Sequence, residues 1–292
     1  EVVTKLDLEY SPSYWTKRFT VPDDAITNHK KFTLEESDKC RQLFRCRLNV
    51  PYGDGKNEKI DIYGDELPDD APIYAYIHGG YWQFLNKHQC SYMAKTLVPG
   101  GYRVIVIEYD VCPNVTVEKI VEQVQKAGLF ILDFAAKTGS RGVSFAGHSC
   151  GGHLMMSMLS EEFVQQAGDN IQLIKHFYLT SGVYDLRELR HLQCVNTDNC
   201  LSLNDENTEK LSIVDNDYSY LKHASITFHV LTAELDTNVY KEQNYHVGKL
   251  LDRCNLKTKY LELKNVDHFN LTENLTTNEY ELTKLILSNV NS

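Results

Sequence analysis

Short apolar runs alternate with longer amphipathic stretches from about residue 44 to the end of the chain. The short runs are bounded by glycine, proline or polar residues, which is typical of strands in a buried sheet. We predict strands over residues 44–50, 58–63, 73–77, 103–109, 143–146, 173–179, 225–233 and 257–263. The turn over residues 51–55 is rich in helix- and strand-breaking residues, so the first two strands are expected to form a hairpin.

The stretches between these runs have the spacing of helices. From Val117 to Lys137 the apolar residues recur every three or four positions, as on the buried face of an amphipathic helix. Further helices are predicted over residues 88–97, 152–159 and 239–251. Alternating strands and helices predict one doubly wound α/β domain over residues 1–292, with a mostly parallel sheet of about eight strands flanked by helices.

Two segments depart from this alternation. Residues 1–43 are polar and irregular, with a cluster of aromatic side chains and a predicted helix only from Glu35 to Phe44. Residues 183–222 are rich in Asn, Asp, Leu and Ser and break the pattern between two strands. We expect the second segment to form a small cap insertion. The first either lies over the mouth of the site as part of that cap or covers the surface elsewhere.

The predicted strand at 143–146 leads into Gly147, His148, Ser149, Cys150 and Gly151, and a predicted helix follows. A G-x-S-x-G sequence between a strand and a helix is typical of a nucleophile elbow, in which the serine stands on a sharp turn. The pentapeptide alone also fits an ordinary Gly-Ser turn. Because the strand and helix supply the required context, we predict that Ser149 is a nucleophile.

The predicted strand at 73–77 runs directly into residues 78–82, which read HGGYW. Glycines after an early strand allow backbone amides to face a substrate, and such amides stabilise the oxyanion of a tetrahedral intermediate. In this arrangement the residue after the nucleophile supplies a further donor. We therefore expect an oxyanion hole formed by the amides of Gly79, Gly80 and Cys150.

An acid and a base should follow the nucleophile in the chain. Asp236 lies just beyond the predicted strand at 225–233, on the face where such sheets bind ligands. The alternatives are that Asp236 caps the following helix and that Glu234 is the acid instead. His268 lies in the loop after the final predicted strand and is the expected base, with Asp267 shaping that loop.

The composition narrows the range of partners. A net charge of −10 over 292 residues disfavours nucleic acid and anionic membranes. No apolar run is long enough to span a membrane, and the first residues lack the apolar core of a signal peptide, although the chain has no initiator methionine. The eight cysteines include no C-x-x-C pair, so no metal is expected. A Cys194–Cys200 bridge is an alternative to free thiols, which fit the cytoplasmic location that we expect.

These motifs resemble those of α/β-hydrolases, and the glycine loop is similar to that of the hormone-sensitive-lipase-like branch. The sequence HGGYW, with GHSCGGHL over residues 147–154 and DHF over residues 267–269, resembles the kynurenine formamidase (arylformamidase) family from about residue 44 onward. The resemblance implies hydrolysis of N-formyl-L-kynurenine to kynurenine and formate in tryptophan breakdown, without a cofactor. It assigns Ser149, Asp236 and His268 as the catalytic residues. Cys150 departs from the small residues, such as alanine, that are common there, but only its amide is needed.

The expected partner is a small aromatic formamide, and the sequence also leaves a homodimer open. Because formyl is the smallest acyl group, selectivity must come from the leaving group. Tyr81 and Trp82 are predicted to form an aromatic wall for it, although Trp82 fits a core position equally well. His153, four residues after Ser149, is expected to line the pocket, with a packed position beside it as the alternative. A general carboxylesterase and a non-catalytic binding protein of the same fold remain as alternative functions.

Overall fold

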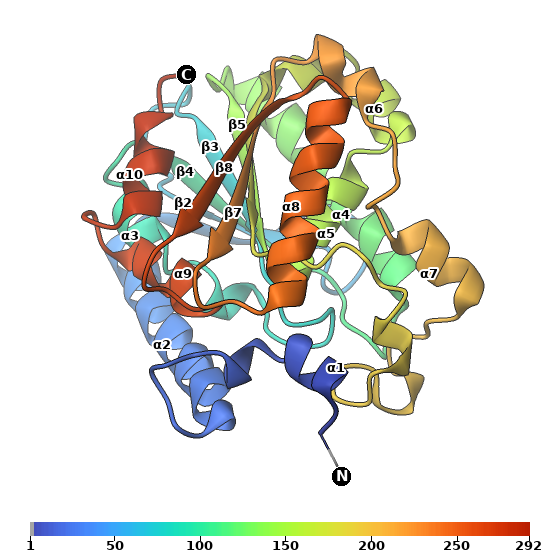
Figure 1. The fold of residues 1–292 in the computed structure, drawn as a ribbon. Coiled ribbons are helices and arrows are strands. Elements are labelled where there is room, and N and C mark those ends of the chain that lie inside the picture. Colours follow the sequence, from blue (N-terminus) through green and yellow to red (C-terminus); the bar gives the residue numbers. More distant parts are fainter. Residues whose placement is uncertain (1–2) are drawn as a thin grey trace.

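The structure is a computed structural model that describes residues 3–292. Its centre is one sheet of eight strands in the order β1-β2-β4-β3-β5-β6-β7-β8 (Figure 1). β2 pairs antiparallel with β1 and β4, and all other neighbouring strands are parallel. This confirms the predicted fold class and the hairpin. The strands are β1 (Cys46–Pro51), β2 (Lys59–Tyr63), β3 (Ile73–Ile77), β4 (Arg103–Ile107), β5 (Val143–His148), β6 (Ile174–Thr180), β7 (Thr227–Ala233) and β8 (Lys257–Leu263).

Helices cover both faces of the sheet. β3 is buried along its whole length, and its alternate residues belong to two separate cores. Ile73, Ala75 and Ile77 pack in the core that contains α4 (Val117–Thr138), α5 (Cys150–Met158) and α8 (Asn238–Arg253). Tyr74 and Tyr76 pack in the opposite core with α3 (Ala94–Leu97), α9 (Asn270–Glu273) and α10 (Glu281–Ser288). The strand therefore reads as a continuous apolar run, as expected for a sheet covered on both sides.

The N-terminal segment is more helical than the sequence predicts. After the short α1 (Lys5–Glu9), α2 runs from Pro22 to Leu43, whereas the sequence pattern predicts a helix only over residues 35–44. Proline at the first helical position and two acidic residues after it are favourable at a helix start. The apolar pattern is weak because the buried face of α2 is largely polar and includes His29, Thr33 and Glu36.

The predicted helix over residues 88–97 is interrupted in the structure. A single 3-10 turn covers Lys87–Gln89, and α3 begins only at Ala94. Between them the amide of Ser91 donates to the Ser37 hydroxyl of α2 at 3.0 Å, so this stretch packs on α2 instead of forming continuous helical hydrogen bonds.

Residues 183–222 lie between β6 and β7 and contain α7 (Asp205–Leu211) and short 3-10 turns. α6 (Glu161–Ala167) follows α5 directly. Figure 1 shows α1 and α2 beyond the ends of β7 and β8 to which their arrowheads point, so the N-terminal segment lies at the carboxyl edge of the sheet.

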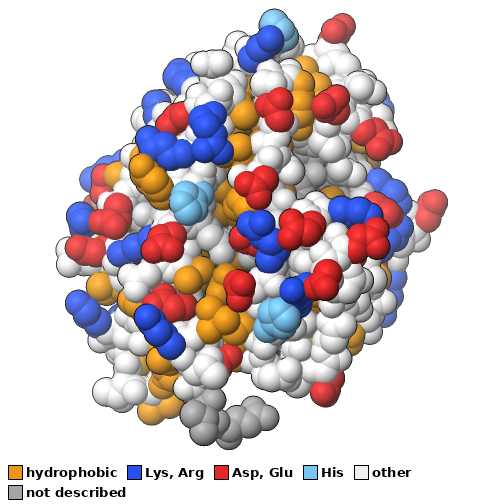
Figure 2. Space-filling model, turned by 45° about the vertical axis from the view of Figure 1, so that its right-hand side comes forward, with side chains coloured by type: hydrophobic (Ala, Val, Ile, Leu, Met, Phe, Trp, Pro, Cys, Tyr) orange, Lys and Arg blue, Asp and Glu red, His pale blue; other side chains and the backbone are white. Residues whose placement is uncertain are grey.

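Positive and negative side chains are interspersed over the face of the molecule in Figure 2, without a continuous basic area. Among the helices described for residues 3–292, none combines the length and apolar character that crossing a bilayer requires.

Buried histidines make the stability of this fold depend on pH. His153 on α5 is fully buried, and its Nε2–H donates to the carbonyl oxygen of Leu211 at 2.8 Å. Burial lowers the pKa of His153 to about 4, although the bond to Leu211 acts in the opposite direction. His176 on β6 and His229 on β7 contact each other, and burial lowers their pKa values to about 4 and about 3.

We predict that the free energy of unfolding falls as the pH is lowered from about 7 to about 5. The unfolded chain takes up protons near the usual histidine pKa of ~6.5, whereas the folded protein keeps these imidazoles neutral, so acid favours unfolding. For His153 the loss is about 2 kcal/mol over this interval. Urea unfolding across that range measures it. His153→Gln, which keeps a donor toward Leu211, should show a weaker pH dependence, and an equal dependence in both proteins would contradict the assignment.

Candidate active site

Ser149 stands at the junction of β5 and α5 in a strained conformation. Its backbone has φ 57° and ψ −127°, a region that side chains with a Cβ rarely adopt. A Cβ added at Gly147 would lie 2.2 Å from the carbonyl oxygen of Gly151, and one added at Gly151 would lie 2.6 Å from that of Ile77. Both positions therefore require glycine, which is the geometry that the predicted elbow demands.

A buried Asp–His pair lies beside this elbow. The Nδ1–H of His268, in the loop after β8, donates to Asp236 Oδ2 at 2.9 Å, and both side chains are buried. Asp236 also accepts the amide of Thr237. The hydroxyl of Thr237, not the carboxylate of Asp236, caps α8. Glu234 accepts the amide of Asn265 away from the pair, so the structure favours Asp236 over both alternatives.

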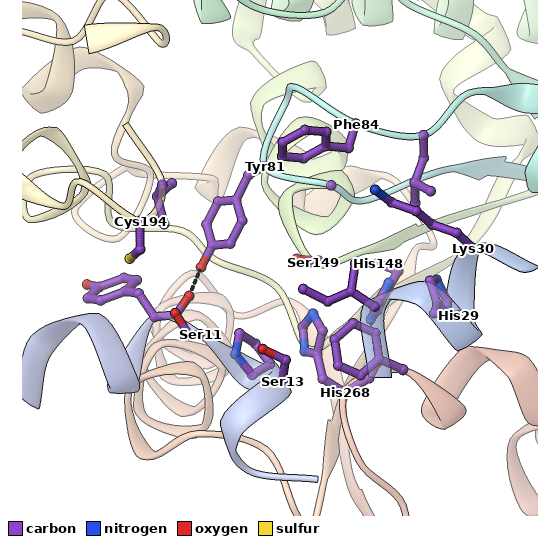
Figure 3. A pocket seen from close by; sticks show the side chains of 17 residues that line it. Ser11, Ser13, His29, Lys30, Tyr81, Phe84, His148, Ser149, Cys194 and His268 are labelled. Atoms are coloured by element: carbon purple, nitrogen blue, oxygen red, sulfur yellow. Dashed lines mark hydrogen bonds between the residues drawn. The ribbon is translucent and has the colours of Figure 1, made fainter. Parts of the chain in front are cut away.

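His148, immediately before Ser149, ties the elbow to the loop of His268. Its Nε2–H donates to the carbonyl oxygen of His268 at 2.9 Å, and the centroids of the two rings are 4.5 Å apart. Burial, with the neighbouring His268, lowers the pKa of His148 well below its usual value, so it stays neutral. Figure 3 shows Ser149, His148 and His268 facing the same pocket.

The glycine loop after β3 packs directly on Ser149. A Cβ at Gly79 would lie 2.8 Å from both the Ser149 Cβ and the His148 carbonyl oxygen, and Gly80 has φ +106°. Among the described backbone hydrogen bonds of residues 3–292, none has the amide of Gly79 or Gly80 as its donor. The amide of Cys150 is at the N-terminus of α5, where helical amides lack partners within the helix. These three amides are free to act as the expected oxyanion donors.

The pocket has a volume of about 370 Å³ and is formed by segments that are distant in sequence. Besides Gly80, Ser149 and His268, its wall includes residues of the first 43 positions and of the segment 183–222. The N-terminal segment contributes Tyr10, Ser11, Pro12, Ser13, Ile26, His29 and Lys30, and the insertion contributes Cys194 and Val195. Of the two alternatives for the N-terminal segment, the structure favours the one at the mouth of the site, since Tyr10 of the aromatic cluster lines the pocket.

The sequence prediction for Trp82 and His153 needs correction. Both side chains are fully buried, neither lines the pocket, and their rings pack edge to face with centroids 5.3 Å apart. The cause lies in the backbone, because Tyr81 and Trp82 both have positive φ, so the loop turns sharply and Trp82 enters the core beside α5. Tyr81 does line the pocket, and Phe84, Leu85 and Phe269 form further apolar wall.

Tyr81 also joins the glycine loop to its surroundings. Its hydroxyl donates to the carbonyl oxygen of Tyr10 at 2.6 Å and accepts a bond from the Tyr240 hydroxyl at 2.6 Å. The ring of Tyr240 packs edge-on against His268, with centroids 4.9 Å apart. The glycine loop, the N-terminal segment and the loop of His268 are thus in contact through two tyrosines.

An ion pair holds the N-terminal segment against the loop of His268. Arg18 donates to Asp267 from Nε at 2.7 Å and from Nη2 at 3.0 Å, and from Nη1 to Glu273 at 3.0 Å. Asp267 also accepts the amides of Phe269 and Asn270, which confirms its predicted role in shaping the loop. Burial opposes ionisation of Asp267, but its bonds to Arg18 and others outweigh burial and lower its pKa.

All eight cysteines are free, so the alternative Cys194–Cys200 bridge is not formed. Within residues 3–292, no group of three or more His, Cys, Asp or Glu side chains is arranged to hold a metal ion.

Comparisons with known proteins agree with this architecture. A family model described as BD-FAE matches residues 60–251. Three solved structures share the fold at low identity. A candidate thioesterase from a Silicibacter species has a TM-score of 0.76 at 23% identity, covering 99% of this chain and 100% of its own. A thermophilic carboxylesterase from a metagenomic library has a TM-score of 0.68 at 16% identity and covers 93% of this chain and 96% of its own. A Pyrobaculum calidifontis esterase has a TM-score of 0.66 at 17% identity and covers 99% of this chain and 98% of its own.

The sheet, the elbow and the buried Asp–His pair are those of an α/β-hydrolase. Kynurenine formamidases match almost the whole chain. The protein from Danio rerio is 30% identical over 97% of this chain and 94% of its own length, and that from Drosophila melanogaster is 31% identical over 96% and 95%. The Salmo salar protein is 32% identical over 97% and 95%. The chain belongs to the kynurenine formamidase family.

We predict that Arg18 positions His268. Arg18→Lys keeps the charge but loses the two parallel bonds to Asp267, so turnover should fall by about tenfold or more, because small displacements of a reacting group are costly. Lys17→Gln changes the neighbouring charge and serves as the control. Turnover of both variants is measured with their melting temperatures. Equal turnover in two folded variants would show that the ion pair does not affect the base.

Proposed function

We propose that this protein is a serine hydrolase that cleaves the formamide bond of N-formyl-L-kynurenine and releases L-kynurenine and formate, a step of tryptophan breakdown. The observation that carries the proposal is the similarity to kynurenine formamidases over 96–97% of the chain. Ser149 and His268 line the same pocket, and His268 donates to the buried Asp236, which supports the proposal.

In the proposed reaction the Oγ of Ser149 attacks the formyl carbon while Nε2 of His268 takes the hydroxyl proton. Asp236 accepts the Nδ1–H of His268, which fixes the tautomer with a free Nε2 and stabilises the imidazolium that forms. The carbonyl oxygen becomes an oxyanion, for which the amides of Gly79, Gly80 and Cys150 are the proposed donors. Preorganised donors of this kind contribute about 3–4 kcal/mol each to the barrier reduction.

The intermediate then collapses. His268 gives its proton to the aryl amine nitrogen, the carbon–nitrogen bond breaks, and kynurenine leaves as a neutral amine. A water molecule, deprotonated by His268, attacks the formyl-serine ester, and formate leaves as the Ser149 hydroxyl is restored. The step needs no oxidant, reductant or cofactor.

The leaving group occupies the larger part of the proposed site. A cavity of about 370 Å³ is of the size that binds small organic ligands. Tyr81, Phe84 and Phe269 offer aromatic surface for the kynurenine ring, in place of Trp82. We propose one domain in which the N-terminal segment and residues 183–222 cap the site, as their contribution to the wall supports. The eight free thiols support a cytoplasmic location.

We predict that the purified chain releases formate from N-formyl-L-kynurenine and that Ser149→Ala abolishes this activity. Loss of the nucleophile in such a triad costs about 10⁶-fold in turnover. Formate and kynurenine are measured together, and an unchanged melting curve shows that the variant is folded. If p-nitrophenyl esters are hydrolysed well and the formamide is not, the protein is a general carboxylesterase instead.

The acid is tested by a matched pair of variants. Asp236→Asn should reduce turnover on the order of 10⁴-fold, because the amide favours the wrong tautomer of His268. Glu234→Gln removes a carboxylate two residues earlier, which lies outside the Asp–His pair, and should have little effect. A larger loss for Glu234→Gln than for Asp236→Asn would show that the acid is misassigned.

A further inference from the structure

The pocket wall combines apolar side chains with hydroxyl and imidazole groups, and it carries a single permanently charged side chain. Of the residues that line the described pocket, Lys30 is the only lysine or arginine, and no aspartate or glutamate is among them. The chain as a whole carries a net charge of −10. Among these lining residues, Lys30 is therefore the side chain with a permanent positive charge that can pair with a substrate carboxylate.

Lys30 is held at the pocket by its place on α2 and by an aromatic ring. Its ammonium nitrogen lies 5.1 Å from the centroid of the Phe84 ring, which is a favourable cation–π distance. Figure 3 shows the Lys30 side chain extending from α2 toward the pocket wall that carries Phe84. No salt bridge of Lys30 is found within residues 3–292, whereas the adjacent Lys31 pairs with Glu35 at 4.0 Å.

We propose that Lys30 binds a carboxylate on the leaving group and so makes the enzyme selective for aryl formamides that carry an amino-acid side chain. The inference rests on the proposed function, since kynurenine bears an α-carboxylate beyond its aromatic ring. The ring of such a substrate packs among Tyr81, Phe84 and Phe269, and its carboxylate meets the ammonium group at the rim. The ion pair forms with substrate and persists through the reaction, so it lowers KM and leaves kcat almost unchanged.

The alternative is that Lys30 is only one of many surface cations and attracts anions from a distance. Lys31 provides the matched control, because it lies one residue away on the same helix, is exposed, and does not line the pocket. Long-range attraction would be lost to a similar degree in Lys30→Gln and Lys31→Gln, whereas direct binding depends on Lys30 alone.

The test compares N-formyl-L-kynurenine with N-formylkynuramine, the same formamide without the carboxylate. For Lys30→Gln we expect KM for N-formyl-L-kynurenine to rise roughly fivefold or more, with little change in kcat, as for the loss of a charge-assisted contact. KM for N-formylkynuramine, which is a cation without a carboxylate, should not rise. Lys30→Glu should give a larger rise, Lys30→Arg should restore most of the affinity, and Lys31→Gln should match the wild type.

Two outcomes overturn the inference while leaving the proposed function in place. One is an equal KM for N-formyl-L-kynurenine in the wild type and Lys30→Gln, and the other is an equal rise for both formamides. If the wild type hydrolyses neither formamide, the proposed function fails. The inference is then decided with two aryl acetates that differ only in a carboxylate on the leaving group. A preference for the anionic ester that Lys30→Gln abolishes supports it, and no such preference refutes it.

Discussion

The carboxyl edge of the sheet depends on three backbone segments that lie closer together than side chains would allow. The end of β3, the end of β5 and the start of α5 meet at Gly79, Gly147 and Gly151, where an added Cβ would lie 2.2–2.8 Å from neighbouring atoms. This close approach holds Ser149 in a conformation that a residue with a Cβ rarely adopts. It also brings the amides of the glycine loop and of the α5 N-terminus to the same side as the serine. The sheet, buried on both faces, supplies the rigidity that keeps the strain in place.

The pocket is built from two groups of segments, the loops at the carboxyl edge of the sheet and the segments that lie outside the strand–helix alternation. The loops that follow the strands provide the elbow, the glycine loop and His268, which line one side of the pocket, and Asp236 lies behind His268. The first 43 residues and the segment at 183–222 provide about half of the remaining wall or more, including Tyr10, Lys30 and Val195. Structures that share the fold at 14–23% identity include esterases, so the fold alone does not determine the leaving group.

Much of the sheet and of the candidate site can be predicted from the sequence, because the patterns that indicate them lie within short stretches of the chain. Glycines mark the close contacts, and Asp236 and His268 each follow a recognisable strand. Other features depend on contacts between distant residues or on local backbone geometry. The Trp82 side chain points into the core because Tyr81 and Trp82 have positive φ values. Neither residue type favours such values, so the sequence does not predict them. The sequence pattern does not predict the first half of α2, because the buried face of this helix is largely polar. For the same reason it does not predict where Lys30 lies.

The ion pair between Arg18 and Asp267 has a consequence for how such sequences diverge. The two residues are 249 positions apart, yet the planar guanidinium matches the carboxylate through two parallel bonds that a lysine or an amide cannot reproduce. Loss of Arg18 leaves the buried carboxylate of Asp267 without its cation, and loss of Asp267 leaves the partly exposed Arg18 paired with Glu273 alone. Substitutions at these positions are therefore tolerated chiefly as pairs. In an alignment of relatives, positions 18 and 267 should covary, and the N-terminal segment should be inherited together with the loop that it holds.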